Sequence, residues 1–364
     1  MNDMTRPLYI IILWLVTLSG CVQVDAQKIV SFKDDNIRYM GRIAYQNDAA
    51  QLFWSGTSMQ INFKGTEAKV SLKDERGDNF FNVIIDGKIV VLHPDAEKRT
   101  YTLATGLSNG PHSLSIFKRT EWADGTTLFF GFEFNTGAEI LAPPAVKKRK
   151  IEFYGDSITS GYGIEDFDGG NNSYLPPYKN NYLTYAALTA RHFDAQFSCI
   201  SKSGIGITVG YTPVTMPELY NRLNPNDPNS LWDFSKFKPD VVVINLFQND
   251  ASLMRQSERP EFKARFGDTP PNDEFIIQAY HKFLLTLRSK YPGTRIICVL
   301  GSMDAVKDAL PWKGYVEKAV ARTNDKLITT HFFAYKNTQG HPSVEENKVM
   351  ADDLIAYIDS HIKW

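Results

Sequence analysis

The sequence is poor in cysteine and has no excess of either charge. Its 364 residues include three cysteines, and 40 basic and 41 acidic residues leave a formal net charge of -1. This balance argues against nucleic acid or an anionic membrane surface as a partner. No cysteine pair has metal-ligand spacing, so we expect no metal site. Cys199 and Cys298 lie in β-like runs and are expected to be small buried residues.

Long apolar runs are also lacking, with one exception near the N-terminus. Residues 8–18 follow Arg6 and are too few to span a bilayer, which indicates a secretory signal. Leu18-Ser19-Gly20-Cys21 resembles a bacterial lipoprotein box, whereas Val24-Asp25-Ala26 would suit ordinary signal peptidase. We favour the first alternative. Residues 1–27 are then a signal and anchor region, Cys21 carries lipid, and the protein is exported to the bacterial envelope, in the periplasm or at the cell surface.

Residues 28–142 alternate apolar and polar side chains in short runs that are separated by turn residues. Asp86-Gly87 between two apolar triplets predicts a two-residue hairpin. The pattern favours an all-β sandwich of about eight strands, jelly-roll-like in class, with its aromatic residues mostly in the core. Pro143-Pro144 and the basic run that follows predict a connector to a second domain.

Residues 150–364 have a different period, because β-like runs alternate with longer helical stretches. We expect strands at 150–154, 196–201, 241–246 and 295–300, and helices at 181–193, 273–290, 313–327 and 343–362. The run 241–244 is continuously apolar, as in a strand that is covered on both faces. This half is predicted to be a three-layer α/β domain with a parallel sheet.

The first of these strands ends in Gly155-Asp156-Ser157-Ile158-Thr159. This sequence predicts a tight turn that holds the Ser157 hydroxyl at the carboxyl edge of the sheet, where open parallel sheets bind ligands. A helix that starts at the turn would point unpaired N–H groups at an oxyanion formed there. Ser157 is therefore a candidate nucleophile, although a lone Gly-Asp-Ser is more often a plain turn.

Two further loops offer donors to the same oxyanion. Ser203-Gly204 follows the second predicted strand, and glycine lets a backbone N–H approach a ligand closely. Asn249 follows the third strand, and its side-chain amide can donate in the same direction. Each residue considered singly is an ordinary turn former.

A candidate general base lies near the C-terminus. His341 precedes Ser343, which forms an S-x-x-E capping box with Glu346 at the start of the last predicted helix. The loop is therefore fixed on one side. His341 is positioned to act as the base for Ser157.

In this order, the Gly155–Thr159 run, Ser203-Gly204, Asn249-Asp250 and His341-Pro342 resemble the four blocks of the SGNH (GDSL) hydrolases. With a β-sandwich in front, the chain resembles carbohydrate esterase family 2. Further likenesses are Trp54-Ser55-Gly56, Ile84-Ile85-Asp86-Gly87, Gly161-Tyr162-Gly163, Tyr185-Ala186-Ala187 and Trp232-Asp233-Phe234.

The resemblance implies removal of O-acetyl groups from plant polysaccharides or their oligosaccharides, such as xylan or glucomannan, through a serine acyl-enzyme and without a metal or organic cofactor. Ser157 would be the nucleophile and His341 the base. The backbone N–H groups of Ser157 and Gly204 and the side chain of Asn249 would form the oxyanion hole. The alternatives are an SGNH hydrolase acting on a lipid, thioester or peptidoglycan, and a carbohydrate-binding protein that has lost catalysis.

The chain departs from the family pattern at two positions. Phe247 occupies the place of the glycine in the third block, which puts the backbone path in doubt and narrows the space near the acetyl group. Thr338 replaces the carboxylate three residues before His341, so the triad is reduced to a dyad. We expect a main-chain carbonyl near Thr338 or Gln339 to accept from His341 Nδ1 instead.

Three aromatic residues are candidates for contact with the sugar. Tyr162 and Tyr174 lie in the loop after the nucleophile, and Trp312 lies beyond the fourth strand, where core packing is an equal alternative. The acidic residues Glu165, Asp166 and Asp168 are expected to be solvated rather than to bind calcium.

Overall fold

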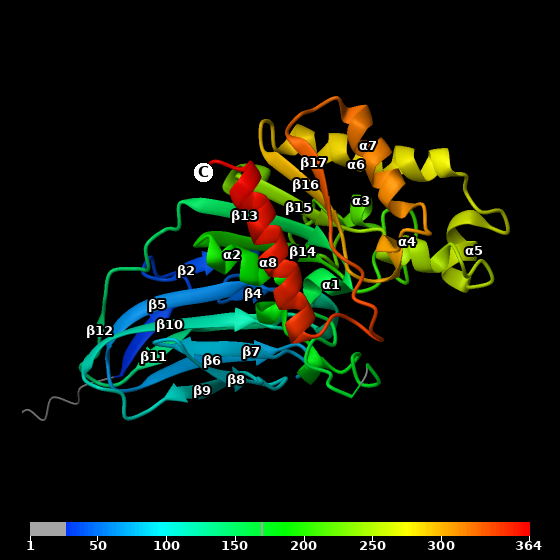
Figure 1. The fold of residues 1–364 in the computed structure, drawn as a ribbon. Helices are drawn as coiled ribbons and strands as arrows, with labels where there is room; N and C mark the ends of the chain where they lie inside the picture. The colour runs from blue at the N-terminus through cyan, green and yellow to red at the C-terminus, as the bar shows by residue number, and fades with distance from the viewer. Residues whose placement is uncertain (1–26, 169) are drawn as a thin grey trace, which may run out of the picture.

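The computed structural model describes residues 27–168 and 170–364. Cys21 and the rest of the predicted signal region, apart from residue 27, lie outside the described residues. A sandwich of two antiparallel sheets is followed by an α/β domain with a parallel sheet, and the two parts lie side by side (Figure 1). Within the described residues, no helix is both long and apolar enough to cross a membrane.

Twelve strands build the sandwich from the described residues. One sheet has the order β3-β4-β11-β6-β9 with β1 beside β11, and the other has the order β12-β5-β10-β7-β8 with β2 beside β5. The strands are β1 (Lys28–Ser31), β2 (Arg38–Met40), β3 (Ile43–Tyr45), β4 (Ala50–Leu52), β5 (Ser58–Gly65), β6 (Ala68–Asp74), β7 (Phe81–Ile85), β8 (Lys88–Leu92), β9 (Arg99–Ala104), β10 (Gly110–Lys118), β11 (Thr127–Phe134) and β12 (Glu139–Ile140).

The expected sandwich is confirmed, but it has more strands than the eight expected. β2, β3 and β12 have only two or three residues, too few to show an alternating pattern. The hairpin at Asp86-Gly87 joins β7 to β8 with both turn residues at positive φ, as the sequence indicates. Alternate aromatic residues such as Phe132 and Phe134 fill the core between the sheets.

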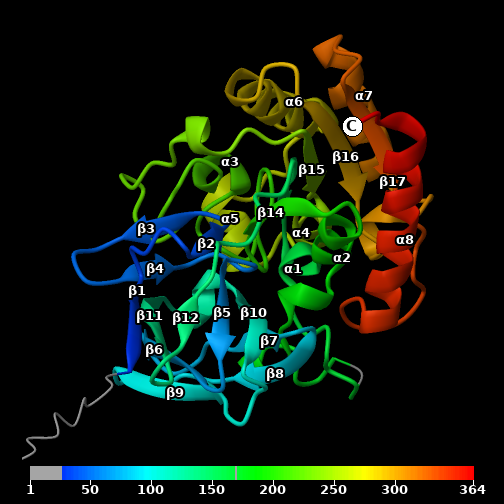
Figure 2. The ribbon, with the colours of Figure 1, turned by 90° about the vertical axis from the view of Figure 1, so that its left-hand side faces the viewer.

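The α/β domain has a five-stranded parallel sheet in the order β14-β13-β15-β16-β17. Figure 2 shows it above the sandwich. Its strands are β13 (Arg149–Gly155), β14 (Ala195–Ser201), β15 (Val241–Asn245), β16 (Arg295–Leu300) and β17 (Ile328–Phe332). Its helices are α1 (Ser157–Ser160), α2 (Tyr185–His192), α3 (Met216–Leu219), α4 (Gln248–Leu253), α5 (Pro260–Phe266), α6 (Asp273–Lys290), α7 (Trp312–Thr323) and α8 (Val344–His361).

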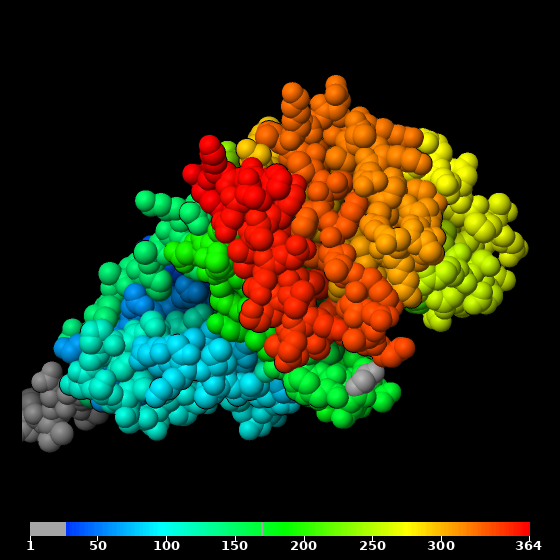
Figure 3. All heavy atoms as spheres, viewed as in Figure 1, coloured from blue at the N-terminus to red at the C-terminus, as the bar shows by residue number. Residues whose placement is uncertain are grey.

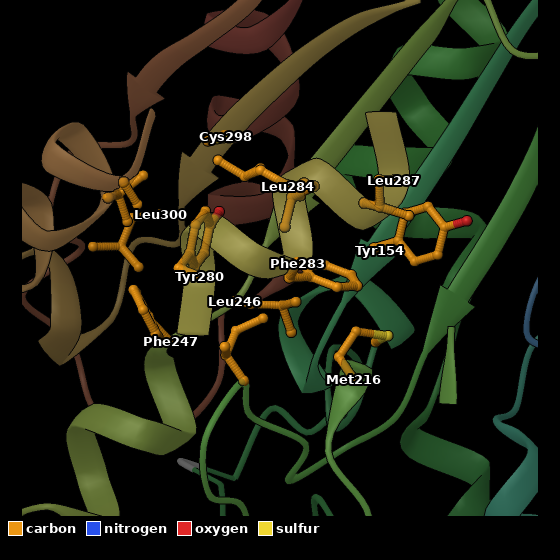
Figure 4. Close-up of a cluster of buried hydrophobic side chains, with 14 of the residues drawn as sticks. Tyr154, Met216, Leu246, Phe247, Tyr280, Phe283, Leu284, Leu287, Cys298 and Leu300 are labelled. Atoms are coloured by element: carbon orange, nitrogen blue, oxygen red, sulfur yellow. The ribbon is translucent and has the colours of Figure 1, made fainter. Parts of the chain in front are cut away.

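Helices cover both faces of this sheet, which confirms the three layers. α2 and α8 bury one face, where Ile151 and Phe153 of β13 point. α6 and α7 bury the other face, toward which Tyr154 of β13 points. Figure 4 shows part of this second core, and Figure 3 shows α8 in red along the outer surface. The capping box of α8 is confirmed, since Ser343 and Glu346 each accept the other's backbone N–H.

The sandwich is anchored in the α/β domain by buried side chains. Trp54 lies in the α6/α7 core and donates through Nε1 to the Leu223 carbonyl at 2.8 Å. Arg42 forms a buried ion pair with Glu152 of β13, with 3.4 Å between Nη2 and Oε1. Removing one partner of such a pair leaves an uncompensated buried charge, which costs about 3–5 kcal/mol. These contacts fix the sandwich relative to the edge of the sheet where Ser157 lies.

Candidate active site

Ser157 begins α1 directly after β13, at the carboxyl edge of the sheet. Asp156 caps the helix, because its Oδ1 accepts from the Ile158 N–H at 3.0 Å. Gly155 is required just before the turn, since a Cβ there would lie 2.0 Å from Thr159 Oγ1. The turn therefore presents the Ser157 hydroxyl as the sequence predicts, and Ser157 is 5% exposed.

The imidazole of His341 meets this hydroxyl. His341 Nε2 lies 2.9 Å from Ser157 Oγ, although the two residues are 184 positions apart. Burial and then the nearby Lys336 ammonium lower the pKa of His341 to about 4, against a smaller opposite effect of Glu121. The imidazole is therefore neutral at neutral pH. A neutral Nε2 can accept the serine proton, as a general base must.

A lysine network occupies the region of the missing triad acid. Lys336 Nζ donates to the carbonyls of Thr338 and Gln339 at 3.2 and 3.0 Å, and lies 3.5 Å from Glu346 Oε2. Thr338 Oγ1 in turn donates to Glu346. The expected hydrogen bond from His341 Nδ1 to one of these carbonyls is not formed among the described residues, where both carbonyls accept from the Lys336 ammonium. No carboxylate of the described residues takes their place.

Gly204 lies in the turn after β14 and has a φ of 82°, a conformation that glycine adopts readily. Its carbonyl accepts from the Tyr211 N–H at 2.7 Å. The described residues supply no acceptor for the Gly204 N–H or the Ser157 N–H. Both donors are therefore free to bind an oxyanion, as their predicted role requires.

Asn249 and Asp250 in α4 tie the third loop to the second. Asn249 Nδ2 donates to the Ile205 carbonyl at 2.8 Å, which orients the amide and leaves its other hydrogen for a ligand. Asp250 is fully buried and accepts from the backbone N–H groups of Ile207, Thr208 and Val209. The loop that follows Gly204 is thereby held on α4.

Phe247 keeps the backbone conformation that a glycine would take, with φ 88° and ψ -10° at the N-cap of α4. Its ring is buried in the core, 4.7 Å from the Tyr280 ring (Figure 4). The Trp312 ring lies 5.2 Å from it. A left-handed conformation costs a residue with a Cβ about 1–2 kcal/mol, which the burial of the ring offsets. The chain path expected for glycine is thus retained, and the ring packs in the core rather than beside an acetyl group.

The three predicted sugar contacts have different positions. The ring of Tyr162 is 4.9 Å from the His341 imidazole, which places it at the site. Tyr174 is 62% exposed in the loop after α1. For Trp312 the structure favours core packing, the second of the two expected alternatives, because this residue is 4% exposed and packs against Phe247 and Tyr315. Its indole is too enclosed to form a wall for a sugar.

A cleft of about 360 Å³ opens beside the imidazole. The loops after β16 and β17 form its walls, which consist of Met303, Asp304, Lys307, Tyr335, Lys336, Thr338, Gln339, Gly340 and His341. In the described part of the chain, no three histidine, cysteine, aspartate or glutamate side chains gather closely enough to hold a metal ion. The cleft offers carbonyl, carboxylate and ammonium groups that can bind hydroxyl groups.

Two charged residues at the site, Lys336 and Glu121, are not among those that the sequence predicts. Lys336 was not recognised because nothing in a loop sequence shows where an ammonium will point. Glu121 belongs to the sandwich, and its Oε2 accepts from the Ser203 N–H at 2.8 Å. The available signal was the run Lys118-Arg119-Thr120-Glu121 at the end of β10, where consecutive polar residues break the alternating pattern. All four are buried in the structure.

Comparisons with known proteins show the family of this chain. Residues 39–144 match the model of the carbohydrate esterase 2 N-terminal domain, and residues 153–348 match the GDSL-like lipase/acylhydrolase family. The structure of a family two carbohydrate esterase from Clostridium thermocellum, in complex with cellohexaose, superposes with a TM-score of 0.79 at 33% identity, over 89% of this chain and 98% of that chain. The chain belongs to carbohydrate esterase family 2.

Two curated relatives of this family member have names that describe an activity. A cellulase/esterase, CelE, of Acetivibrio thermocellus is 35% identical over 91% of this chain. The chain spans only 40% of the length of that relative. An acetylxylan esterase/glucomannan deacetylase of Cellvibrio japonicus is 28% identical, over 87% of this chain and 89% of that protein.

Proposed function

We propose that this family 2 member is a serine esterase that removes O-acetyl groups from a plant polysaccharide or its oligosaccharides, of the acetylated xylan or glucomannan type. The observation that carries the proposal is the 2.9 Å approach of His341 Nε2 to Ser157 Oγ, beside the unpaired N–H groups of Ser157 and Gly204. A nucleophile, a base and an oxyanion hole are the parts that acyl transfer needs.

Acylation begins when Ser157 Oγ attacks the acetyl carbonyl carbon and His341 Nε2 accepts the hydroxyl proton. The carbonyl oxygen becomes an oxyanion, which accepts hydrogen bonds from the Ser157 and Gly204 N–H groups and from Asn249 Nδ2. The bond from the acetyl carbon to the sugar oxygen then breaks. The sugar oxygen takes the proton from His341 Nε2, and the acetyl group remains on Ser157.

Deacylation repeats these steps with water. His341 Nε2 accepts a proton from a water molecule as the water oxygen attacks the acetyl carbon, and the same donors hold the second oxyanion. The bond to Ser157 Oγ breaks, the serine oxygen recovers the proton, and acetic acid leaves and ionises in solution. Because the pKa of His341 is about 4, the base is regenerated in its neutral form.

The substrate class is supported by the relatives and by the site. The C. japonicus relative is named for xylan and glucomannan, and the C. thermocellum structure holds a sugar chain. In this chain the cleft beside His341 carries Asp304, Lys307 and Tyr335, which suit hydroxyl groups and a sugar ring better than an alkyl chain. These contacts favour a glycan as the alcohol part of the ester.

The test is acetate release from acetylated xylan, acetylated glucomannan and acetylated peptidoglycan by the wild-type protein and by Ser157→Ala. We expect release from at least one of the two plant polymers and none with the variant, whose circular dichroism should match the wild type. Release from peptidoglycan alone, or binding of deacetylated polymers without any release, would replace this proposal with one of its alternatives. Full activity of Ser157→Ala would exclude the mechanism.

We also propose that the protein is exported and anchored by lipid on Cys21, which the N-terminal sequence pattern supports. In a bacterial host, the full chain should incorporate labelled palmitate and enter the detergent phase of Triton X-114. Cys21→Ala should abolish both. An unlabelled mature protein that begins after Ala26 would support ordinary signal cleavage instead.

A further inference from the structure

Glu121 extends from the sandwich to the loop that carries the Gly204 donor. It follows β10 and precedes a short 3₁₀ helix at Trp122–Asp124. Its side chain is 2% exposed, and its Oε2 accepts from the Ser203 N–H at 2.8 Å. Ser203 is the residue before Gly204, so this contact lies one peptide unit away from the oxyanion donor.

The backbone groups on both sides of the Gly204 N–H are held in place. The Ser203 N–H is held by Glu121, and the Ile205 N–H donates to the Lys202 carbonyl at 3.2 Å. The backbone N–H of Lys202 donates to the Gly155 carbonyl at 3.2 Å, beside the turn that carries Ser157. Among these four contiguous residues, the Gly204 N–H is the one that has no acceptor within the described structure.

Among the groups that hold this turn, Glu121 is the one that does not belong to the α/β domain. Lys179 Nζ lies 3.5 Å from Oε1, and Lys202 Nζ lies 3.8 Å from Oε2. Burial alone would favour the neutral acid, but the two ammonium groups and the Ser203 N–H outweigh it and hold the pKa of Glu121 below its usual value. The residue is therefore an ionised, strong acceptor.

We propose that Glu121 is a positioning residue for the oxyanion hole, through which the sandwich fixes the direction of the Gly204 N–H. The inference depends on the proposed esterase activity and adds a catalytic role for the N-terminal domain. A preorganised donor stabilises the transition state more than the ground state. Loss of the contact should therefore lower kcat and leave KM nearly unchanged.

Asp124 provides a matched control in the same cluster. It too is buried and pairs with Lys179, at 2.5 Å from Nζ, but no hydrogen bond joins it to the Ser203–Gly204 turn. It also caps the Glu121 N–H through Oδ2, an interaction that an asparagine oxygen can keep. Asp124→Asn therefore disturbs the buried charges without removing the hydrogen bond to Ser203.

The experiment compares Glu121→Met, Glu121→Gln and Asp124→Asn, with p-nitrophenyl acetate as substrate and thermal unfolding as a check of the fold. Methionine removes the acceptor at similar size, and we expect kcat to fall about tenfold or more with KM within about twofold. Glutamine keeps an acceptor oxygen and should retain most of kcat. The Asp124→Asn variant should lose stability but keep kcat within about twofold.

A second readout is the inhibition constant of methylboronic acid, whose adduct with Ser157 Oγ places an oxygen in the oxyanion hole. Glu121→Met should weaken this inhibition by a factor similar to the loss in kcat. If Glu121→Met fails to fold, the Glu121→Gln variant must retain both kcat and boronate affinity. The proposal is overturned if kcat falls no further in Glu121→Met than in Asp124→Asn, or if Glu121→Met changes KM instead of kcat. It is also overturned if Glu121→Gln strongly lowers kcat or the affinity for the boronate. A wild-type protein that hydrolyses no ester would refute the esterase function itself, which is a different result.

Discussion

The two loops that flank Ser157 are held in different ways. The oxyanion turn around Gly204 donates hydrogen bonds to Glu121 of the sandwich and to the Gly155 carbonyl of β13, and it accepts one from Asn249 of α4. The loop of His341 is fixed by the Lys336 ammonium and by the capping box of α8. The imidazole itself has one hydrogen-bond partner among the described residues, Ser157 Oγ.

The difference indicates where this site obtains its catalytic power. The oxyanion donors are preorganised by buried backbone contacts, whereas the base lacks the carboxylate that would stabilise an imidazolium. Burial, and then the nearby Lys336 ammonium, lower the pKa of His341 and keep the imidazole neutral over a wide pH range. The first part of the site stabilises the transition state, and the second accepts and returns a proton.

The largest effect is expected when the base is removed. His341→Ala should lower kcat for p-nitrophenyl acetate by about four orders of magnitude, because Ser157 loses its proton acceptor. The control is His331→Ala, since His331 lies at the neighbouring edge strand and pairs with Asp353 at 2.9 Å. That control should leave kcat unchanged. Equal losses in the two variants would remove His341 from the mechanism.

Removal of the Asn249 amide tests whether this side chain stabilises the oxyanion. Asn249→Ala is expected to lower kcat by about 10²–10³ with little change in KM, as is typical of an oxyanion donor. Gln248→Ala is the matched control on the same helix, because Gln248 only accepts from the Ala305 N–H at 3.0 Å. A loss with Asn249→Ala that is no larger than the control's would show that the amide does not face the substrate.

The pH dependence of activity tests the pKa of His341. The acid limb of kcat/KM should lie near pH 4, the pKa of His341, because protonation abolishes the base. Lys336→Met removes a cation that disfavours the imidazolium, so the pKa should rise and the acid limb should move to higher pH. Lys336→Arg should keep the wild-type profile. An unchanged limb in Lys336→Met, with the fold intact, would mean that burial alone sets this pKa.

The smallest effect concerns Phe247, whose backbone supports the oxyanion side. Both Phe247→Ala and Phe247→Gly should destabilise the protein by about 3–5 kcal/mol through the lost ring. Glycine relieves the left-handed strain at this position, so the glycine variant should be the more stable of the two by about 1 kcal/mol. Urea unfolding of the two variants measures this difference. A more stable alanine variant would show that the strain is absent.

The sequence predicts the centre of the α/β domain well. The runs at 150–154, 241–246 and 295–300 are mostly apolar, and the observed β13, β15 and β16 agree with them to within a residue at each end. α6 is observed at the predicted bounds. β17 was missed, because Ile328–Phe332 is a half-exposed edge strand with two threonines and a histidine. β14, at the other edge, is buried along most of its length and was predicted to within a residue, so it is the exposed strand that is hard to recognise.

The candidate site was only partly predictable. Ser157, Gly204, Asn249 and His341 stand at local turn and cap signals, and the structure brings them to one edge of the sheet. The roles of Lys336 and Glu121 depend on contacts between distant segments, which one sequence does not show. For Trp312 the sequence left core packing and sugar contact as equal alternatives, and the structure shows core packing against Phe247.

The most direct test of the account is to find the acetyl group on the enzyme. The protein is mixed with p-nitrophenyl acetate, quenched in acid during turnover, digested and analysed by mass spectrometry. The account predicts the mass of one added acetyl group on the peptide that contains Ser157, and its absence from Ser157→Ala. An acetyl group found only on another residue would contradict the account. So would acetylation of another residue in Ser157→Ala together with turnover at the wild-type rate.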